Sequence, residues 1–298
     1  DLGFSVGPRI NAEGRLVDMS IGIECLLSET TAEALAFARE LHRLNKDRRA
    51  SEDGMQREAL LIIAGRNFGG VKDLPAAMTL YLGGWHQGVI GILASRVKER
   101  LHRPTIAFAD GDEGQVKGSA RSSPGIHIRD ILDAVATRHP GLISRFGGHA
   151  MAAGLTLAQS DYPAFADAFV AEVARHTEDV ELQAVIESDG ELAPGEFNLD
   201  LATQLRYAGP WGQHFPEPTF DGRFRLESQR LVGERHLKMT LCPVGSGHSI
   251  DAIAFNVDLK CWPNEDAREV DIAFRLEVNE FRGRKSVQLL VEQLNVAA

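Results

Sequence analysis

The longest regular pattern of apolar residues lies near the start of the chain. The apolar positions that carry it are Leu35, Ala38, Leu41 and Leu44. Their recurrence every three residues keeps them on one side of a helix. Thr30 and Glu33 precede them as a Thr-x-x-Glu capping box. The pattern predicts a helix over residues 30–64, with Gly54 as a weak point, which at ~1.5 Å per residue is roughly 50 Å long. A charged helix of that length is typical of a bridge between two bodies.

The first twenty residues, "DLGFSVGPRINAEGRLVDMS", show neither helical nor strand periodicity. They are rich in glycine and asparagine, which favour turns. We therefore expect a structured loop at the edge of something larger.

From residue 76 the pattern changes to alternating strands and helices. Strands are predicted at residues 77–82, 104–109, 116–122 and 151–157, and helices at 86–101, 128–136 and 161–176. This alternation indicates an α/β domain.

Beyond residue 178 the chain consists of short β-prone runs separated by turn residues. The predicted strands are 219–232, 236–244, 249–257, 270–281 and 285–296, after a helical piece at 199–209. Strands at this spacing indicate a small barrel or sandwich. The fold class predicted for the whole chain is multidomain, α/β plus all-β.

Composition limits the kinds of function that fit. The 298 residues are 44% hydrophobic, enough for sizeable cores, and the formal net charge is -10. Proteins that coat nucleic acid indiscriminately usually carry a basic excess. Any site for a polyanion must therefore be local.

The cysteines and the apolar runs indicate a cytoplasmic protein. Cys25, Cys242 and Cys261 are odd in number and form no C-x-x-C pair, which argues against a disulfide framework or a zinc knuckle. We interpret them as reduced thiols. No apolar run approaches the ~20 residues of a membrane span, and no signal segment opens the chain.

The stretch "RFGGHAMAAG" is the first candidate binding site. Paired glycines let a main chain approach a ligand and adopt positive φ, and consecutive N–H groups can form an anion-binding concavity. Gly147 and Gly148 would form that concavity, with His149 at its rim. The alternative is a tight turn that leads into a strand.

The stretch "KGSARSS" offers a second anion-binding group. Strand alternation places Lys117, Ser119 and Arg121 on one face. Arginine suits bidentate phosphate recognition, and serine adds a donor. A solvated strand face is the alternative.

Two glycine-bracketed stretches add further donors. In "GPRINAEGR" these are Arg9, Asn11 and Arg15; such loops are often functional, although a pair of arginines can be structural. In "GGWHQG", His86 and Gln87 stand where we expect a helix to begin, a position that attracts anions. They could equally be capping residues, and we expect Trp85 in the core.

The last domain carries basic residues among scattered aromatics. They are Arg230, Arg235, His236, Lys238, Arg282, Arg284 and Lys285, with Phe215, Phe224, Trp262 and Phe281 nearby in sequence. Basic groups beside exposed aromatics suit single-stranded nucleic acid. The alternative places most of these aromatics in the core.

Motifs that activate water or a nucleophile are missing from the sequence. There is no H-E-x-x-H helix, D-x-D-G loop, Walker A loop or G-x-S-x-G turn, and no plausible Cys–His pair. The chain has parts that could grip a phosphodiester without parts that would cleave it.

Taken in order, "GPRINAEGR", "GWHQGVIGILASRVKER", "GSARS" and "FGGHAMAAG" resemble the RecJ family of single-strand-specific exonucleases, in the DHH phosphoesterase superfamily. The later "GPWGQHFPEP", "QRLVGERHLK", "DAIAFN" and "VNEFRG" resemble the family's C-terminal oligonucleotide-binding barrel. The resemblance covers essentially all of the chain.

This resemblance implies a 5′-to-3′ exonuclease that hydrolyses single-stranded DNA to mononucleotides with Mg²⁺ or Mn²⁺. The aspartate-rich motifs and the Asp-His-His run that hold the metals in such enzymes are not in this sequence. We therefore expect a part of a longer protein that binds no metal itself. The implied divisions are a DHH tail (1–29), a connecting helix (30–66), a DHH-associated domain (67–177) and an OB-fold-like domain (178–298).

The resemblance also implies roles for the candidate residues. Gly147, Gly148 and His149 would contact the phosphate nearest the metals, and Arg121 with Ser119 would stabilise charge beside it. The groove near the 5′ end would be lined by Arg9, Asn11 and Arg15, the strand path flanked by His86 and Gln87, and the 3′ portion held by Arg235 and Lys238.

Two alternatives remain. The first is a non-catalytic module that binds single-stranded DNA or docks a protein such as a single-strand-binding protein. The second is a DHH phosphodiesterase for short oligonucleotides or cyclic dinucleotides, although such relatives usually lack the barrel.

Overall fold

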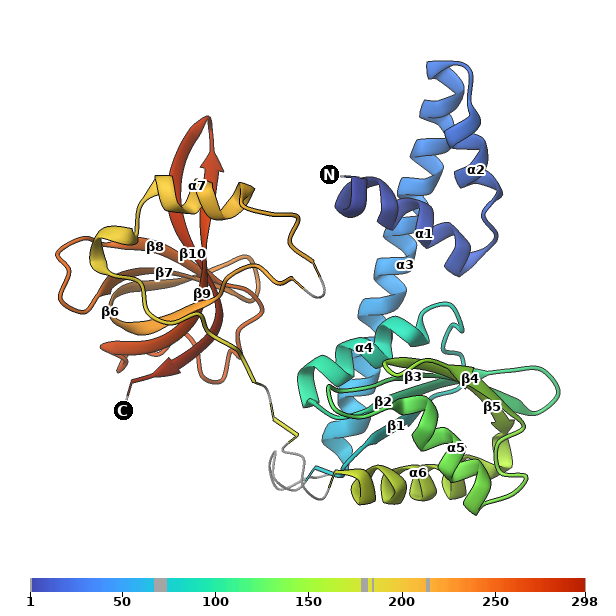
Figure 1. Cartoon of the computed structure of the whole chain (residues 1–298). Coiled ribbons are helices and arrows are strands. Elements are labelled where there is room, and N and C mark those ends of the chain that lie inside the picture. The colour runs from blue at the N-terminus through green and yellow to red at the C-terminus, as the bar shows by residue number, and fades with distance from the viewer. Residues whose placement is uncertain (1, 67–73, 178–181, 184, 213–214, 298) are drawn as a thin grey trace. The chain divides into compact units, whose positions relative to one another are not determined.

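The computed structural model describes residues 2–66, 74–177, 182–183, 185–212 and 215–297. It divides into two compact units, Asp1–Ala184 and Val185–Ala298 (Figure 1). The first holds the long helix and an α/β sheet, and the second holds a short helix and the barrel. The predicted domain starts at residues 67 and 178 lie outside the described residues.

The opening segment is helical, so the expectation of a loop is wrong. It forms a π-helical turn η1 (Leu2–Val6), α1 (Gly7–Leu16) and α2 (Ser20–Leu27). Tertiary packing outweighs the low helix propensity of the glycines, because Ala12 and Glu13 are fully buried when α1 forms. The Glu13 carboxylate accepts hydrogen bonds from the N–H groups of Ile21 and Gly22, both at 2.6 Å, and so caps α2.

The predicted long helix is α3 (Thr31–Gly65), which runs unbroken past Gly54. Thr30 caps it: its hydroxyl oxygen accepts from the Glu33 N–H at 3.3 Å, and the hydroxyl donates to the Glu33 carboxylate at 2.8 Å. Its first half packs against α1 and α2, and its second half packs against the sheet unit (Figure 1). Among the described helices, none is both long and apolar enough to cross a membrane.

The first unit contains a five-stranded sheet in the order β1-β2-β3-β5-β4. The β1–β2 pair is parallel and the other pairs are antiparallel. The strands are β1 (Met78–Tyr81), β2 (Thr105–Asp110), β3 (Gln115–Arg121), β4 (Arg145–Gly148) and β5 (Ala152–Ala158). Sequence periodicity did not predict β4, which has only four residues, two of them glycine.

Helices pack on both faces of this sheet. One face holds α4 (Ile90–Leu101) and the second half of α3, around a core that includes Leu80, Leu93 and Ala107. The other face holds α5 (Ile128–Arg138) and α6 (Tyr162–His176), which follows the short η3 (Gln159–Asp161). The strands between these layers are therefore buried where a helix covers them.

The second unit is a closed five-stranded barrel in the order β10-β8-β7-β6-β9. The strands are β6 (Phe220–Val232), β7 (His236–Pro243), β8 (Ile250–Ala254), β9 (Glu269–Phe281) and β10 (Arg284–Val296), preceded by η4 (Pro194–Glu196) and α7 (Leu199–Tyr207). The parallel β8–β10 pair closes an otherwise antiparallel sheet, the topology of an OB fold. The predicted fold class, α/β plus an OB-like barrel with a long helix, is confirmed.

Candidate nucleic-acid interface

One face of the sheet is covered only in part. Strand register aligns Ala107, Ser119, Gly154 and Gly147 in a row across β2, β3, β5 and β4. Residues directly opposite in antiparallel strands project to the same face. Ala107 belongs to the core beneath α4, so the whole row lies on the α4 side. The helix α4 packs on β2 and β3, and Gly154 and Gly147 are exposed.

We call this side of β3, β5 and β4, from the edge of α4 outward, the open sheet face. Its residues are Lys117, Ser119, Arg121, Ala152, Gly154, Thr156, Arg145 and Gly147. All are small, hydroxylated or cationic, and none is acidic. Lys117, at the far end of β3, pairs with Asp112 at 3.2 Å. Such a face lets an anionic chain lie close to the backbone.

The two glycines of "FGGH" differ in why a side chain is absent. A Cβ on Gly148 would lie 2.4 Å from the Ala152 carbonyl oxygen, and its φ is +147°, so the fold itself requires glycine. A Cβ on Gly147 would meet no atom within 4 Å. No described contact explains the missing side chain at Gly147, which makes it the place where a ligand could approach.

The glycine pair lies in strand β4, and the turn follows it at residues 149–151, so the expectation of a glycine turn is corrected. The His149 N–H donates to the Ala152 carbonyl at 2.8 Å. Because hydrogen-bonded and free positions alternate along an antiparallel ladder, the Gly148 N–H points away from β5. Since β4 is the outermost strand, this N–H is a donor at the sheet edge, beside the exposed His149 side chain.

Arg121 and Ser119 lie together at the first turn of α4. Arg121 Nη1 donates to Ser119 Oγ at 3.0 Å and to the Ala120 carbonyl at 2.8 Å. A Cβ on Gly91 would lie 2.8 Å from Arg121 Nη2 and 3.0 Å from Ser119 Oγ. The pair is thus held against the backbone of α4, with glycine making room for it.

Arg15 of α1 reaches the same end of α4. Its Nη1 donates to the Gly88 carbonyl at 3.2 Å, and a Cβ on Gly88 would lie 1.9 Å from the Arg15 carbonyl oxygen. Burial lowers the pKa of Arg121, and the neighbouring charge of Arg15 lowers it further. Arginine stays protonated at neutral pH all the same. The partners of the two guanidiniums among the described residues are carbonyl and hydroxyl oxygens and no carboxylate, so the two positive charges are available to an anion.

The turn before α4 carries His86 and Gln87 outside the helix, which begins at Ile90 and not at His86 as predicted. Gln87 Nε2 donates to the Asp110 carbonyl at 2.7 Å, so its amide nitrogen fixes the turn to β2. His86 Nδ1 accepts from the Gly88 N–H at 3.1 Å. The neutral ring therefore carries its proton on Nε2 as a donor. Trp85 is 5% exposed, which confirms it as core.

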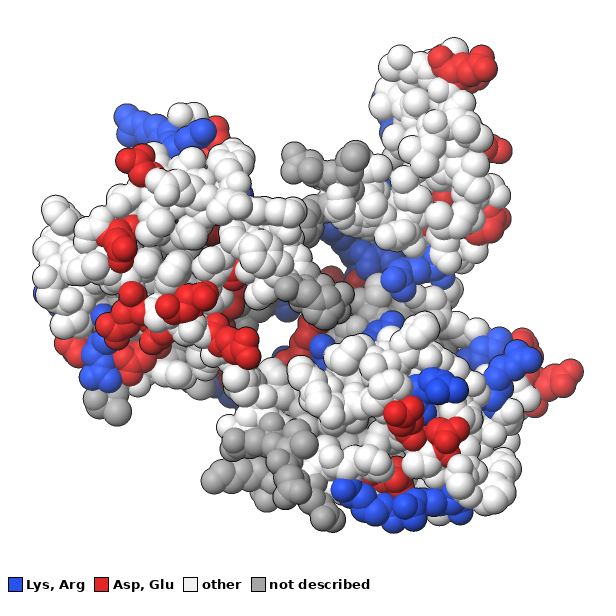
Figure 2. Space-filling view, viewed as in Figure 1, with Lys and Arg blue, Asp and Glu red and all other residues white. Residues whose placement is uncertain are grey.

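The structure does not bring Arg9 and Asn11 to this cluster. Arg9 Nε donates to His42 Nδ1 of α3 at 3.3 Å, and Arg9 also donates to the Ser5 carbonyl. Asn11 is exposed on α1. Figure 2 shows Lys and Arg side chains gathered between the helices α1–α2 and the sheet.

Sequence analysis missed Arg145, whose only signal was its position two residues before the glycine pair.

The two basic residues predicted to contact DNA on the barrel differ in their surroundings. Lys238 Nζ pairs with Asp251 at 2.9 Å, whereas Arg235 is exposed in the β6–β7 turn. Phe224 and Trp262 are buried, as the alternative interpretation required. Phe215 and Phe281 are 55% and 65% exposed, and the Arg282 guanidinium lies 5.2 Å from the centre of the Phe281 ring.

The described residues do not fit a metal centre. No group of three or more His, Cys, Asp or Glu side chains in this part of the chain could hold a metal ion. The candidate interface consists of cations, hydroxyls and backbone N–H groups, which bind anions.

Comparison with known families matches the two parts separately. A family profile of the DHHA1 domain matches residues 75–175, and one of the RecJ OB domain matches residues 188–293. The first match spans the open sheet face, and the second spans the barrel strands.

Comparison with individual proteins gives one consistent result. The chain is 54% identical over 295 residues to the single-stranded-DNA-specific exonuclease RecJ of Dickeya dadantii, and 50% identical to that of Escherichia coli. Each alignment covers 99% of this chain and 51% of the relative. The chain thus spans about half the length of the curated relatives it matches.

Solved structures agree with this result. RecJ of Thermus thermophilus in complex with Mn²⁺ matches with a TM-score of 0.80 at 29% identity, over 100% of this chain and 41% of that one. The complex with Mg²⁺ matches with a TM-score of 0.79 at 28% identity, over 100% of this chain and 44% of that one.

Proposed function

We propose, because this chain belongs to the RecJ family, that it binds and positions single-stranded DNA for a 5′-to-3′ exonuclease that hydrolyses phosphodiester bonds. The observation that carries the proposal is the open sheet face. Arg121 lies on this face, and Arg15 of α1 reaches the same end of α4. Neither has a carboxylate partner among the described residues, and Gly147 leaves the backbone of the same face bare. A phosphate needs such a combination of charge and close backbone approach.

The phosphates are assigned along this face. Gly147, the Gly148 N–H and His149 hold the phosphate that is cleaved. Arg121, Ser119 and Arg15 hold the neighbouring phosphate toward the 5′ end. Support comes from the hydrogen bond between Arg121 and Ser119 and from the shared contact of both arginines with the start of α4.

The remaining predicted residues receive outer roles. His86 donates from Nε2 at the edge of the DNA path, and Gln87 fixes the turn that carries it. Arg9 and Asn11 precede Arg15 on α1, and they contact only the 5′ end of the DNA. Arg235, and more weakly Lys238, hold the 3′ portion on the barrel, where Phe281 offers a ring for base stacking.

Hydrolysis is assigned to the rest of the enzyme. The described residues contain no metal-ligand cluster, so we assign this part no hydrolytic step of its own. Divalent metal, Mg²⁺ or Mn²⁺ as in the related structures, belongs to a part of the enzyme outside this chain. The role of this chain is to orient the phosphate, a contribution that depends on preorganised geometry. We place the protein in the cytoplasm, where DNA is processed.

The experiment measures binding and cleavage together. Fluorescence anisotropy with a labelled single-stranded oligonucleotide and its duplex should show preference for the single strand, lost in Arg121→Ala and His149→Ala. Incubation of a 5′-labelled oligonucleotide with Mn²⁺ should give no cleavage by this chain. Robust cleavage would contradict the division of labour.

A docking or DNA-binding module without a catalytic partner is the second candidate. The exposed aromatics and free cations of the barrel turns favour it. A single-strand-binding protein is the partner expected in that case. Binding that persists in Arg121→Ala and His149→Ala but is lost in barrel variants would support this second candidate over the first.

A further inference from the structure

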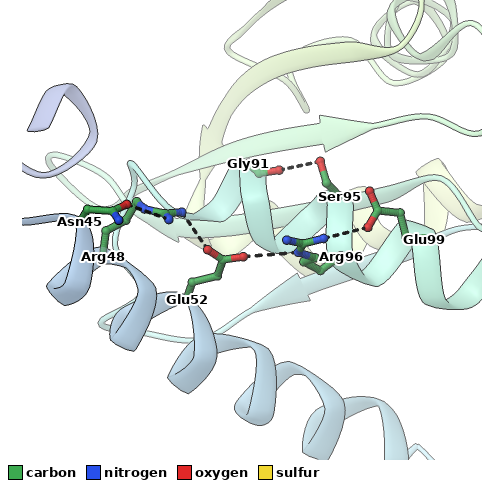
Figure 3. Close-up of polar contacts among 7 residues, drawn as sticks. All are labelled: Asn45, Arg48, Glu52, Gly91, Ser95, Arg96 and Glu99. Carbon is green, nitrogen blue, oxygen red and sulfur yellow. Dashed lines mark hydrogen bonds and ion pairs between the residues drawn. The ribbon is translucent and has the colours of Figure 1, made fainter. Parts of the chain in front are cut away.

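A buried carboxylate joins the long helix to α4. Glu52 of α3 is 11% exposed in its side chain. It accepts from Arg48 of its own helix at 2.8 Å and pairs with Arg96 of α4 at 3.4 Å (Figure 3). Arg48 also donates to Asn45 Oδ1 at 3.2 Å. A buried carboxylate is tolerated only while its cationic partners stay in place, so this group fixes how α3 and α4 cross.

The other end of α4 forms one wall of the phosphate site. Gly91 packs against Arg121 and Ser119, and Gly88 packs against Arg15. Ser95, which directly precedes Arg96, donates a hydrogen bond from its hydroxyl to the Gly91 carbonyl at 3.1 Å (Figure 3). Gly91 and Arg96 belong to the same hydrogen-bonded helix, so a tilt of α4 at Arg96 would displace the Gly91 turn.

The helix α3 also supports α1, the helix that bears Arg15. α1, which bears Arg15, packs on α3, so α3 supports Arg15 directly and Arg121 through α4. The two guanidiniums lie close enough to repel each other. Something must hold them together against this repulsion before a phosphate arrives.

We propose that Glu52 is a positioning residue for phosphate binding, which pins α4 on α3 so that Arg15 and Arg121 share one phosphate. This inference rests on the proposed function and names the group that sets its geometry. The apolar contacts of Met55 and Ala59 hold the same two helices together, and a 2.8 Å hydrogen bond from Trp85 to Glu58 ties the turn before α4 to α3. Loss of Glu52 should therefore alter spacing more than folding.

The test is a double-mutant cycle on the whole chain. Dissociation constants for a 5′-phosphorylated, 3′-labelled oligothymidylate are measured for Arg15→Ala, Arg121→Ala and the double variant, with and without Glu52→Gln. With Glu52 present, the double variant should lose less affinity than the product of the single losses, because both arginines serve one phosphate. With Glu52→Gln, affinity should start about tenfold lower and the losses should multiply.

Glu99→Gln is the matched control. Glu99 pairs with the same Arg96 at 3.3 Å but lies on α4 itself, with 53% of its side chain exposed. It should keep the affinity and the coupling of the unaltered chain. Arg96→Gln is the second variant, because it leaves Glu52 paired with Arg48 and no buried carboxylate alone. It should reproduce the loss of coupling, and it decides the matter if Glu52→Gln does not fold.

Unchanged coupling in Glu52→Gln or Arg96→Gln overturns the inference, even if the melting temperature falls. In that case binding by the unaltered chain and its loss in Arg121→Ala would leave the proposed function standing. Failure of the unaltered chain to bind the oligonucleotide overturns both.

Discussion

The two units present their cations in different ways. Arg121 on the open sheet face and Arg15 of α1 are held by backbone and hydroxyl groups and have no carboxylate partner among the described residues. On the barrel strands, cations are neutralised: Lys238 pairs with Asp251, and Arg223 pairs with Asp271 at 2.8 Å. A band of Asp and Glu crosses the barrel surface in Figure 2.

This difference separates geometry from affinity. A guanidinium fixed against a helix and a strand is preorganised, so it can orient a phosphate. Arg235 and Arg282 of the barrel stand in turns and have no carboxylate partner among the described residues. We expect them to add attraction without fixed direction. We therefore expect the first unit to determine where the phosphate lies and the barrel to add to the affinity.

The largest expected effect is that of Arg121→Ala. Removal of a charge-assisted phosphate contact costs about 2 kcal/mol, roughly 30-fold in affinity for single-stranded DNA. Fluorescence anisotropy measures it. The matched control is Arg129→Ala, an exposed arginine on α5, which packs on the opposite face of the sheet. Equal losses in both variants would show that general charge, and not the open face, binds DNA.

The glycine pair separates ligand approach from folding. Gly147→Val should fold normally, because a Cβ at this position meets no atom within 4 Å. It should weaken DNA binding about tenfold by occupying the place of the phosphate. Gly148→Ala should lower the free energy of unfolding by about 2 kcal/mol, since its backbone and the Ala152 carbonyl both exclude a Cβ. Chemical denaturation and anisotropy test the two effects. A destabilised Gly147→Val with normal affinity would contradict this assignment.

On the barrel, the free cation should matter more than the paired one. Arg235→Ala should weaken binding about threefold and reduce the log–log salt slope by about 0.7, the value for one phosphate on a single strand. Lys238→Ala should change less, because Lys238 already pairs with Asp251. Salt titrations of the two variants provide the measurement, and the reverse order would show that the ion pair opens when DNA binds.

The smallest effect concerns the pH dependence of the barrel. Burial raises the pKa of Glu277, and Glu217 and Glu292 raise it further against the opposing charges of Arg275 and Arg206. An acid whose pKa is higher in the folded state takes up a proton on folding, so its contribution to stability falls as pH rises above the ordinary glutamate range.

Glu277→Gln should therefore stabilise the chain by a few tenths of a kcal/mol at pH 8, a gain that should disappear near pH 4. The side chain is 41% exposed, which keeps the effect small. Urea denaturation at several pH values measures it. Glu280→Gln, exposed on the same strand, is the control. A gain that grows as the pH falls would contradict the sign.

Local pattern by itself determined most of the elements of this protein. The periodicity around Leu41 and the Thr30 cap predicted α3, because a helix start and an apolar stripe are properties of neighbouring residues. Short β-prone runs between turn residues predicted the barrel strands, and the order of short motifs indicated the RecJ family. The residues that we propose to hold phosphate, among them Arg121 and Gly147, could be named because their chemistry is readable from their type and from their immediate neighbours in the sequence.

Only the tertiary structure decided which of these residues act together. The helices α1 and α2 form because α3 buries Ala12 and Glu13, which no local pattern announces. The strand β4 exists because β5 pairs with it. Strand register leaves room for a Cβ at Gly147 and excludes one at Gly148. Arg15 and Arg121 both contact the start of α4 because α1, which bears Arg15, packs on α3. Each residue's chemistry is a property of the sequence, whereas long-range packing sets the distances between residues, and anion binding depends on both.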